Sequence, residues 1–162
     1  AVARNAGFAK TVVYDSVGNH EELLRVLVAR EQERAMRDVA AAMPALPFGG
    51  PEDLLGNGLT ALLSSVRQHP ATWRLILLPA DGAPPVLRED VDRSREQLRE
   101  QLEPIVKWGL ETLGAADIDA EVATLALLAT VENAIRITLS DPDRFPAERL
   151  AEFGRALVRR VA

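Results

Sequence analysis

Cysteine is absent from this sequence, and histidine occurs only twice, as His20 and His69. Without cysteine, the chain can form no disulfide, zinc–thiolate site, iron–sulfur cluster or cysteine nucleophile. The two histidines fall on separate predicted elements, and the sequence has no Ser/His/Asp arrangement, glycine-rich phosphate loop or HExxH pattern. We therefore expect no enzymatic activity, no catalytic residue, no metal site and no cofactor.

Long apolar runs and an excess of positive charge are also missing. No uninterrupted apolar run reaches roughly 18 residues, and the N-terminus has no basic-plus-apolar signal stretch. We expect a cytoplasmic protein with no transmembrane helix and no membrane partner. The formal net charge of −5 argues against a strongly basic, nonspecific nucleic-acid binder, but it allows a small DNA-reading head on an acidic body.

Aromatic residues make up only 4% of the 162 residues, and the alternation typical of β-strands is scarce. Apolar residues instead recur at three- and four-residue spacing almost throughout. This spacing predicts an all-α fold of one domain, or of one domain with a small appendage. We expect helices over residues 19–42, 51–68, 71–78, 85–113, 117–139 and from 146 onward.

The first 24 residues carry the most specific pattern. An Ala-Gly turn at 6–7 is followed by a short helix over 9–16, a Gly-Asn turn at 18–19 and a long helix that starts with Glu-Glu at 21–22. This layout resembles the helix-turn-helix head of the TetR family of transcriptional regulators. The resemblance implies that the short helix enters the DNA major groove. It also implies that the first helix of the family's head is absent from this chain, which starts inside the second.

The resemblance assigns DNA contacts to residues 10–20. Lys10 and Thr11 match the exposed start of the reading helix, Tyr14 matches a tyrosine near its end, and His20 falls where the next helix begins. The chain departs from the family pattern at several of its positions. Asp15 adds a negative charge, and His20 stands where the family usually has lysine and is mostly neutral at pH 7. An alternative therefore stays open: a helical, dimeric module that binds a small molecule or a protein and has no DNA-binding activity.

The resemblance further implies two parts. Residues 1–42 would form a partial DNA-binding helix-turn-helix with its connecting helix, and residues 43–162 a helical effector-binding and dimerisation domain. Polar residues that interrupt the most apolar predicted helix, together with two tryptophans and apolar neighbours on other helices, are typical of a largely apolar ligand site. The candidate ligand-binding residues are Trp73, Ile76, Leu77, Ile105, Trp108, Glu132, Asn133 and Arg136.

Some of these candidate residues, and the run of charged residues over 88–103, have a structural interpretation instead. Glu132 and Arg136 are spaced i, i+4, and an intrahelical ion pair is favoured over a ligand role for them. Trp73 is favoured as a core residue over a ligand contact. The charge run over 88–103 is interpreted as a solvated helix face.

The last two predicted helices have wide apolar faces, and Gly154 would allow a close helix approach. Two such helices from each subunit can form a four-helix bundle across a two-fold axis, although they can also simply close the core of a monomer. The candidate dimer-interface residues are Leu127, Val131, Leu150, Phe153, Gly154, Leu157, Val158 and Val161.

Together, these features and the TetR resemblance imply a ligand-responsive transcriptional regulator. We expect a homodimeric repressor that binds a double-stranded DNA operator and is released by a small-molecule effector. The scarcity of charged residues in the expected interior favours a largely apolar effector. The long helix over 19–42 connects body to head, so its movement would change the separation of the two heads.

Overall fold

The computed structural model describes residues 20–43, 49–77 and 85–161, with only the backbone described at 20, 21, 24, 85–90 and 161. Over these ranges the chain forms α-helices and no strand. The helices are α3 (His20–Ala42), α4 (Pro51–Gln68), α5 (Pro70–Ile76), α6 (Pro85–Thr112), α7 (Ala120–Ser140) and α8 (Ala147–Val161). The predicted all-α fold is therefore confirmed.

Prolines and one glycine set several of the helix boundaries. Pro51 and Pro70 occupy the first turns of α4 and α5, where the missing backbone N–H has no helical partner to lose. Just beyond α6, Gly114 adopts a φ of 74°, and the N–H of Ala115 donates to the carbonyl of Leu110 at 2.9 Å. This termination needs the left-handed conformation that glycine adopts readily.

The start of α7 differs from the sequence prediction. Apolar spacing predicts a start at Asp117, whereas the helix begins at Ala120. Asp119 is the reason, because its Oδ1 accepts hydrogen bonds from the N–H groups of Glu121 and Val122 at 2.9 and 3.1 Å. Such a cap satisfies donors that a helix start otherwise leaves open. Capping chemistry, rather than apolar periodicity, therefore fixes this end.

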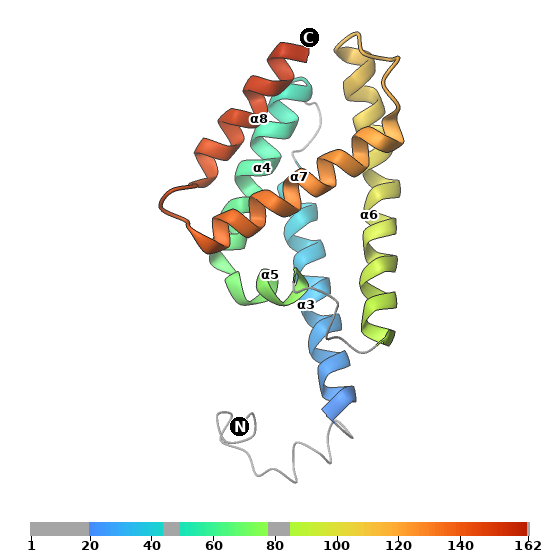
Figure 1. Cartoon of the computed structure of the whole chain (residues 1–162), viewed down its shortest axis with the longest axis vertical. Coiled ribbons are helices and arrows are strands. Elements are labelled where there is room, and N and C mark those ends of the chain that lie inside the picture. Colours follow the sequence, from blue (N-terminus) through green and yellow to red (C-terminus); the bar gives the residue numbers. More distant parts are fainter. Residues whose placement is uncertain (1–19, 44–48, 78–84, 162) are drawn as a thin grey trace.

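The described helices surround a core centred on α4. This helix makes its most extensive contacts with α8, while α3 packs against both α4 and α5 and α7 crosses the molecule diagonally (Figure 1). Leu63 and Val66 of α4 have no exposed surface. Trp73 of α5 and Ile135 of α7 belong to the same buried cluster. The helix α6 lies at the edge, and α7 is its main packing partner (Figure 1).

By length and composition, α7 could cross a membrane, because it is 21 residues long and an 18-residue window within it has a mean hydropathy of 1.5. The expectation of no such helix rested on uninterrupted apolar runs, which α7 lacks. A core helix also meets this criterion, and α7 packs against α4, α5 and α6. Only 22% of the span is buried in the chain, so much of its surface remains uncovered.

Candidate functional site

A cavity of about 670 Å³ is walled chiefly by residues of α3, α4, α5, α6 and α7. Its volume falls in the range of small-molecule sites in proteins. Most of the lining is aliphatic or aromatic. The polar and charged lining residues are Gln32, Asp92, Ser94, Arg95, Glu96, Arg99 and Glu132.

Most of the predicted ligand-binding residues meet at this cavity. The six that line it are Trp73, Ile76, Leu77, Ile105, Trp108 and Glu132. Trp73 is also only 4% exposed and belongs to the core cluster, whereas Trp108 is 37% exposed. The preference for a core role of Trp73 therefore agrees with its position, although the residue also lines the cavity.

Asn133 and Arg136 do not line the cavity. Asn133 is exposed, and Nη1 of Arg136 donates to the backbone carbonyl of Leu77 at 2.9 Å. The expected ion pair between Glu132 and Arg136 does not form, because Glu132 Oε1 lies 3.3 Å from Nε of Arg95 on α6. The i, i+4 spacing permitted the local pair, but tertiary packing supplied each side chain with another partner.

Sequence reasoning missed the contribution of α3 to the cavity. Gln32, Ala35, Met36 and Val39 line it from one side of this helix. Their spacing of three and four residues is the signal that could have revealed them.

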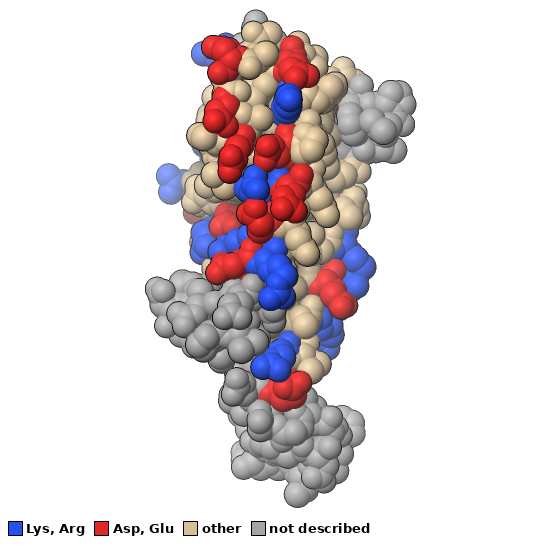
Figure 2. Space-filling model, turned by 90° about the vertical axis from the view of Figure 1, so that its right-hand side faces the viewer, with Lys and Arg blue, Asp and Glu red and all other residues tan. Residues whose placement is uncertain are grey.

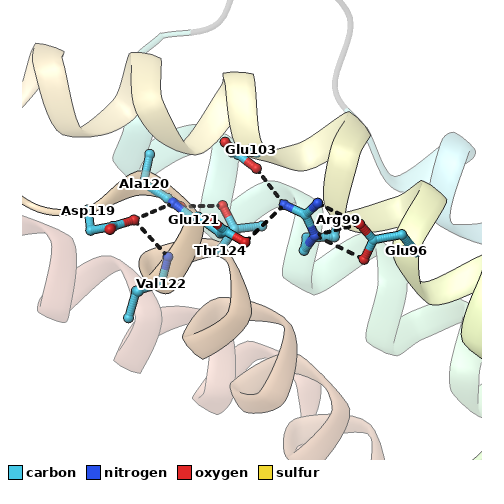
Figure 3. A network of polar contacts seen from close by, with 8 residues as sticks. All are labelled: Glu96, Arg99, Glu103, Asp119, Ala120, Glu121, Val122 and Thr124. Atoms are coloured by element: carbon cyan, nitrogen blue, oxygen red, sulfur yellow. Dashed lines mark hydrogen bonds and ion pairs between the residues drawn. The ribbon is translucent and has the colours of Figure 1, made fainter.

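Charged side chains join α6 to α7. Figure 3 shows Arg99 of α6 between Glu96 and Glu103 of the same helix and Glu121 of α7. Nη1 of Arg99 lies 2.6 Å from Glu103 Oε2 and 3.8 Å from Glu121 Oε1. The hydrogen bonds between Arg99 and Glu96 raise the pKa of the guanidinium and lower the pKa of this carboxyl. Arg99 and Glu96 are therefore both charged at neutral pH.

The charge run over 88–103 is thus more than a solvated face. Figure 2 shows acidic and basic side chains together along the side of the molecule that lies at the right in Figure 1. The side chain of Arg99 is only 18% exposed. Within this run, Arg95 and Arg99 reach carboxylates of α7, so the run fixes one wall of the cavity against its neighbour.

A buried carboxylate connects α3 to α5. Glu31 is 6% exposed, and its Oε2 accepts a hydrogen bond from the hydroxyl of Thr72, itself 2% exposed, at 2.5 Å. Its other oxygen accepts from Arg30 at 2.7 Å, and Arg34 lies 3.3 Å away. The Thr72 bond, followed by the Arg30 bond, lowers the pKa of Glu31 despite its burial. This contact joins residues 41 positions apart, and no local sequence pattern predicts it.

The predicted dimer residues divide into two groups. Phe153 and Leu157 of α8 are 61% and 48% exposed. Val122 and Leu125 of α7, which sequence reasoning did not select, are 60% and 50% exposed. These four side chains are large, apolar and uncovered within the chain.

Other predicted dimer residues face inward. Gly154 is buried, and a Cβ there would lie 3.6 Å from Leu55 of α4. The close helix approach at Gly154 is therefore between α8 and α4 of the same chain. Leu150 and Val131 pack on the core cluster. Two more of the predicted dimer residues, Leu127 and Val158, line the cavity. The side chain of Val161 lies outside the described residues.

The predicted DNA contacts stay predictions. Lys10, Thr11 and Tyr14 lie outside the described residues, and His20 begins α3 without a described side chain. Over the described ranges, no group of three or more histidine, aspartate or glutamate side chains is arranged to hold a metal ion.

Comparisons with known proteins identify one similar fold. No protein-family model matches the sequence, and no curated protein matches it. A solved structure does: a TetR-like transcriptional regulator from Rhodococcus sp. RHA1, with a TM-score of 0.74 and 22% sequence identity. The match covers 98% of this chain and 80% of the other. The chain therefore has the fold of a TetR-like transcriptional regulator.

Proposed function

We propose that this chain is a TetR-like, ligand-responsive transcriptional regulator that acts in the cytoplasm as a homodimeric repressor. The observation that carries the proposal is the position of α3. This helix follows the segment that resembles a DNA-reading head, and its other end lines the cavity. In the proposal, residues 1–42 bind DNA and residues 43–162 bind the effector and the second subunit.

The effector acts by shifting a population between two positions of α3. Ala35, Met36 and Val39 lie on the cavity wall, so a ligand that fills the cavity touches the helix leading to the head. A ligand that fits one position of α3 better than another favours that position by the difference in binding free energy. In a two-fold dimer this changes the separation of two DNA-reading heads, which must match half-sites one helical turn of DNA apart.

The uncovered apolar side chains support a dimer. Val122 and Leu125 on α7, with Phe153 and Leu157 on α8, are each about half exposed or more. A second copy of the chain that covers these helices would bury this apolar surface, as helix bundles across a two-fold axis do.

In the proposal, Lys10, Thr11, Tyr14 and His20 contact the operator. The test is binding of the full chain to DNA upstream of its own gene at two salt concentrations. We expect tight binding that random DNA does not compete away. We also expect the affinity to fall as salt rises, because phosphate contacts release counterions.

Release by an effector requires that effector and operator weaken each other's binding. An effector that weakens operator binding by a given factor must itself bind the operator complex more weakly by the same factor. Equal effector affinity with and without operator would exclude the mechanism. Operator binding no better than binding to random DNA at either salt concentration would favour a dimeric binding module without DNA-binding activity.

A further inference from the structure

The charged side chains that line the cavity are largely matched to one another. Arg95 pairs with Glu132 at 3.3 Å, and Arg99 pairs with Glu96 and two further carboxylates. An anionic ligand would have to displace a carboxylate from an arginine, and a cationic ligand would have to displace an arginine from a carboxylate. A charged ligand that left these pairs intact would be buried against the aliphatic lining without a partner for its charge, which is costly. The lining therefore favours an uncharged ligand.

Gln32 of α3 offers a neutral polar group to the same cavity. This residue is half-buried on α3 and lies one turn before Ala35 and Met36 in the cavity-facing stripe. In the described part of the chain, its side-chain amide has no hydrogen-bond partner. A carboxamide can both donate and accept, so it recognises a carbonyl, ether or hydroxyl oxygen equally well.

The backbone that carries Gln32 is held in place by its neighbour. Glu31 bonds to Thr72 of α5 in a buried contact, which fixes this turn of α3 against the body. A side chain presented from an anchored turn loses less freedom on binding than one on a mobile segment. Gln32 is therefore well placed to hold a ligand against α3.

We propose that the cavity takes an uncharged, mostly apolar small molecule with one hydrogen-bonding oxygen, and that Gln32 binds this oxygen through its carboxamide. This inference rests on the proposed function for its regulatory meaning, since Gln32 sits on the helix that leads to the head. It adds the chemical class of the effector and a residue that recognises it.

The test uses four probes of related shape, titrated into the full chain by calorimetry. Benzophenone carries the acceptor oxygen, and diphenylmethane lacks it. Methyl 4-benzoylbenzoate adds a neutral ester, and 4-benzoylbenzoate adds a negative charge at the same position. We expect benzophenone to bind about three- to tenfold more tightly than diphenylmethane, as one hydrogen bond allows. We expect the methyl ester to bind at least about tenfold more tightly than the anion.

Variants then assign the hydrogen bond. Gln32→Leu should weaken benzophenone to the affinity of diphenylmethane and leave diphenylmethane unchanged or slightly tighter. Asn133→Leu is the matched control, because Asn133 is an exposed amide of α7 that does not line the cavity. It should leave the binding of all four probes unchanged, and circular dichroism should show that both variants are folded.

Three results would overturn the inference. The first is tighter binding of the anion than of its ester, and the second is an equal loss for benzophenone and diphenylmethane in Gln32→Leu. The third is no binding of any probe up to its solubility limit. None of these measurements contains DNA, whereas operator binding is measured without a probe. A failed ligand class and a failed regulator function therefore give separate results.

Discussion

The hydroxyl of Thr72 donates its hydrogen bond to the carboxylate of Glu31 inside the contact between α5 and α3. Trp73, the next residue of α5, lines the cavity, as does Gln32, the next residue of α3. The buried bond therefore joins the two residues that directly precede these cavity residues in the sequence, on two different helices. A ligand that moves either helix acts on this bond as well.

Thr72→Val should destabilise the fold. Valine keeps the shape of threonine but removes the donor, so the buried Glu31 carboxylate loses a partner, and we expect a loss of about 1–3 kcal/mol in the free energy of unfolding. Urea denaturation measures this value. Thr72→Ser keeps the hydroxyl and should recover most of the hydrogen-bond contribution. A loss of stability in Thr72→Ser but not in Thr72→Val would show that the methyl group, and not the hydroxyl, matters.

The contribution of Glu31 should also depend on pH. Its pKa is lowered in the folded protein from the ordinary value of 4.5. The carboxylate therefore stabilises the fold above that value, and the contribution is lost as the pH falls through the lower folded pKa. The difference in unfolding free energy between the unmodified chain and Glu31→Gln should be largest near neutral pH and shrink in acid. A difference that stays constant into acid would contradict this assignment.

Two glycines at the contact between α4 and α8 should respond oppositely to alanine. A Cβ at Gly154 would meet Leu55 at 3.6 Å, an ordinary contact, and alanine favours the helix by about 0.5–1 kcal/mol. A Cβ at Gly56 would overlap Arg155, whose Nη2 donates to Asn57 at 2.9 Å.

We therefore expect Gly154→Ala to raise the thermal midpoint of unfolding. Gly56→Ala should lower it, with a cost of about 1 kcal/mol or more from overpacking. Calorimetric melting of both variants tests the pair, and a loss of stability in Gly154→Ala would place a closer neighbour at this position than Leu55.

The helices could be predicted from the sequence, but the partners of their polar side chains could not. Proline positions and apolar spacing give the bounds of α4, α5 and α6 within a few residues. Apolar spacing alone cannot find the cap at Asp119, which shortens α7. Five of the six cavity residues were found because apolar residues on neighbouring helices gather in the interior, and Glu132 was found because it interrupts an apolar helix.

The errors have a common physical cause. Glu132 and Arg136 satisfy a local rule, yet Arg95 and the carbonyl of Leu77 compete for them through tertiary packing. Likewise, the apolar spacing around Gly154 does not say whether a helix faces its own chain or a second copy. Such choices depend on residues far apart in the sequence.

The double substitution Phe153→Glu and Leu157→Glu should weaken the dimer. Both side chains are exposed on α8, and a carboxylate at each would be buried without a partner in a bundle across a two-fold axis. Sedimentation velocity should show a shift from dimer to monomer. Val26→Glu serves as the control, because Val26 is 52% exposed on α3, away from α8. A dimer that survives the double substitution would place the interface elsewhere.

The edge position of α6 affects how long a ligand stays bound. This helix walls the cavity, yet its main packing is with α7 alone. Elements with few neighbours open locally at a smaller free-energy cost than the core does. Backbone amides of α6 should therefore exchange hydrogen for deuterium sooner than those of α4. The wall can then loosen to admit or release a ligand while the buried helices stay folded, so ligand exchange is separate from global unfolding.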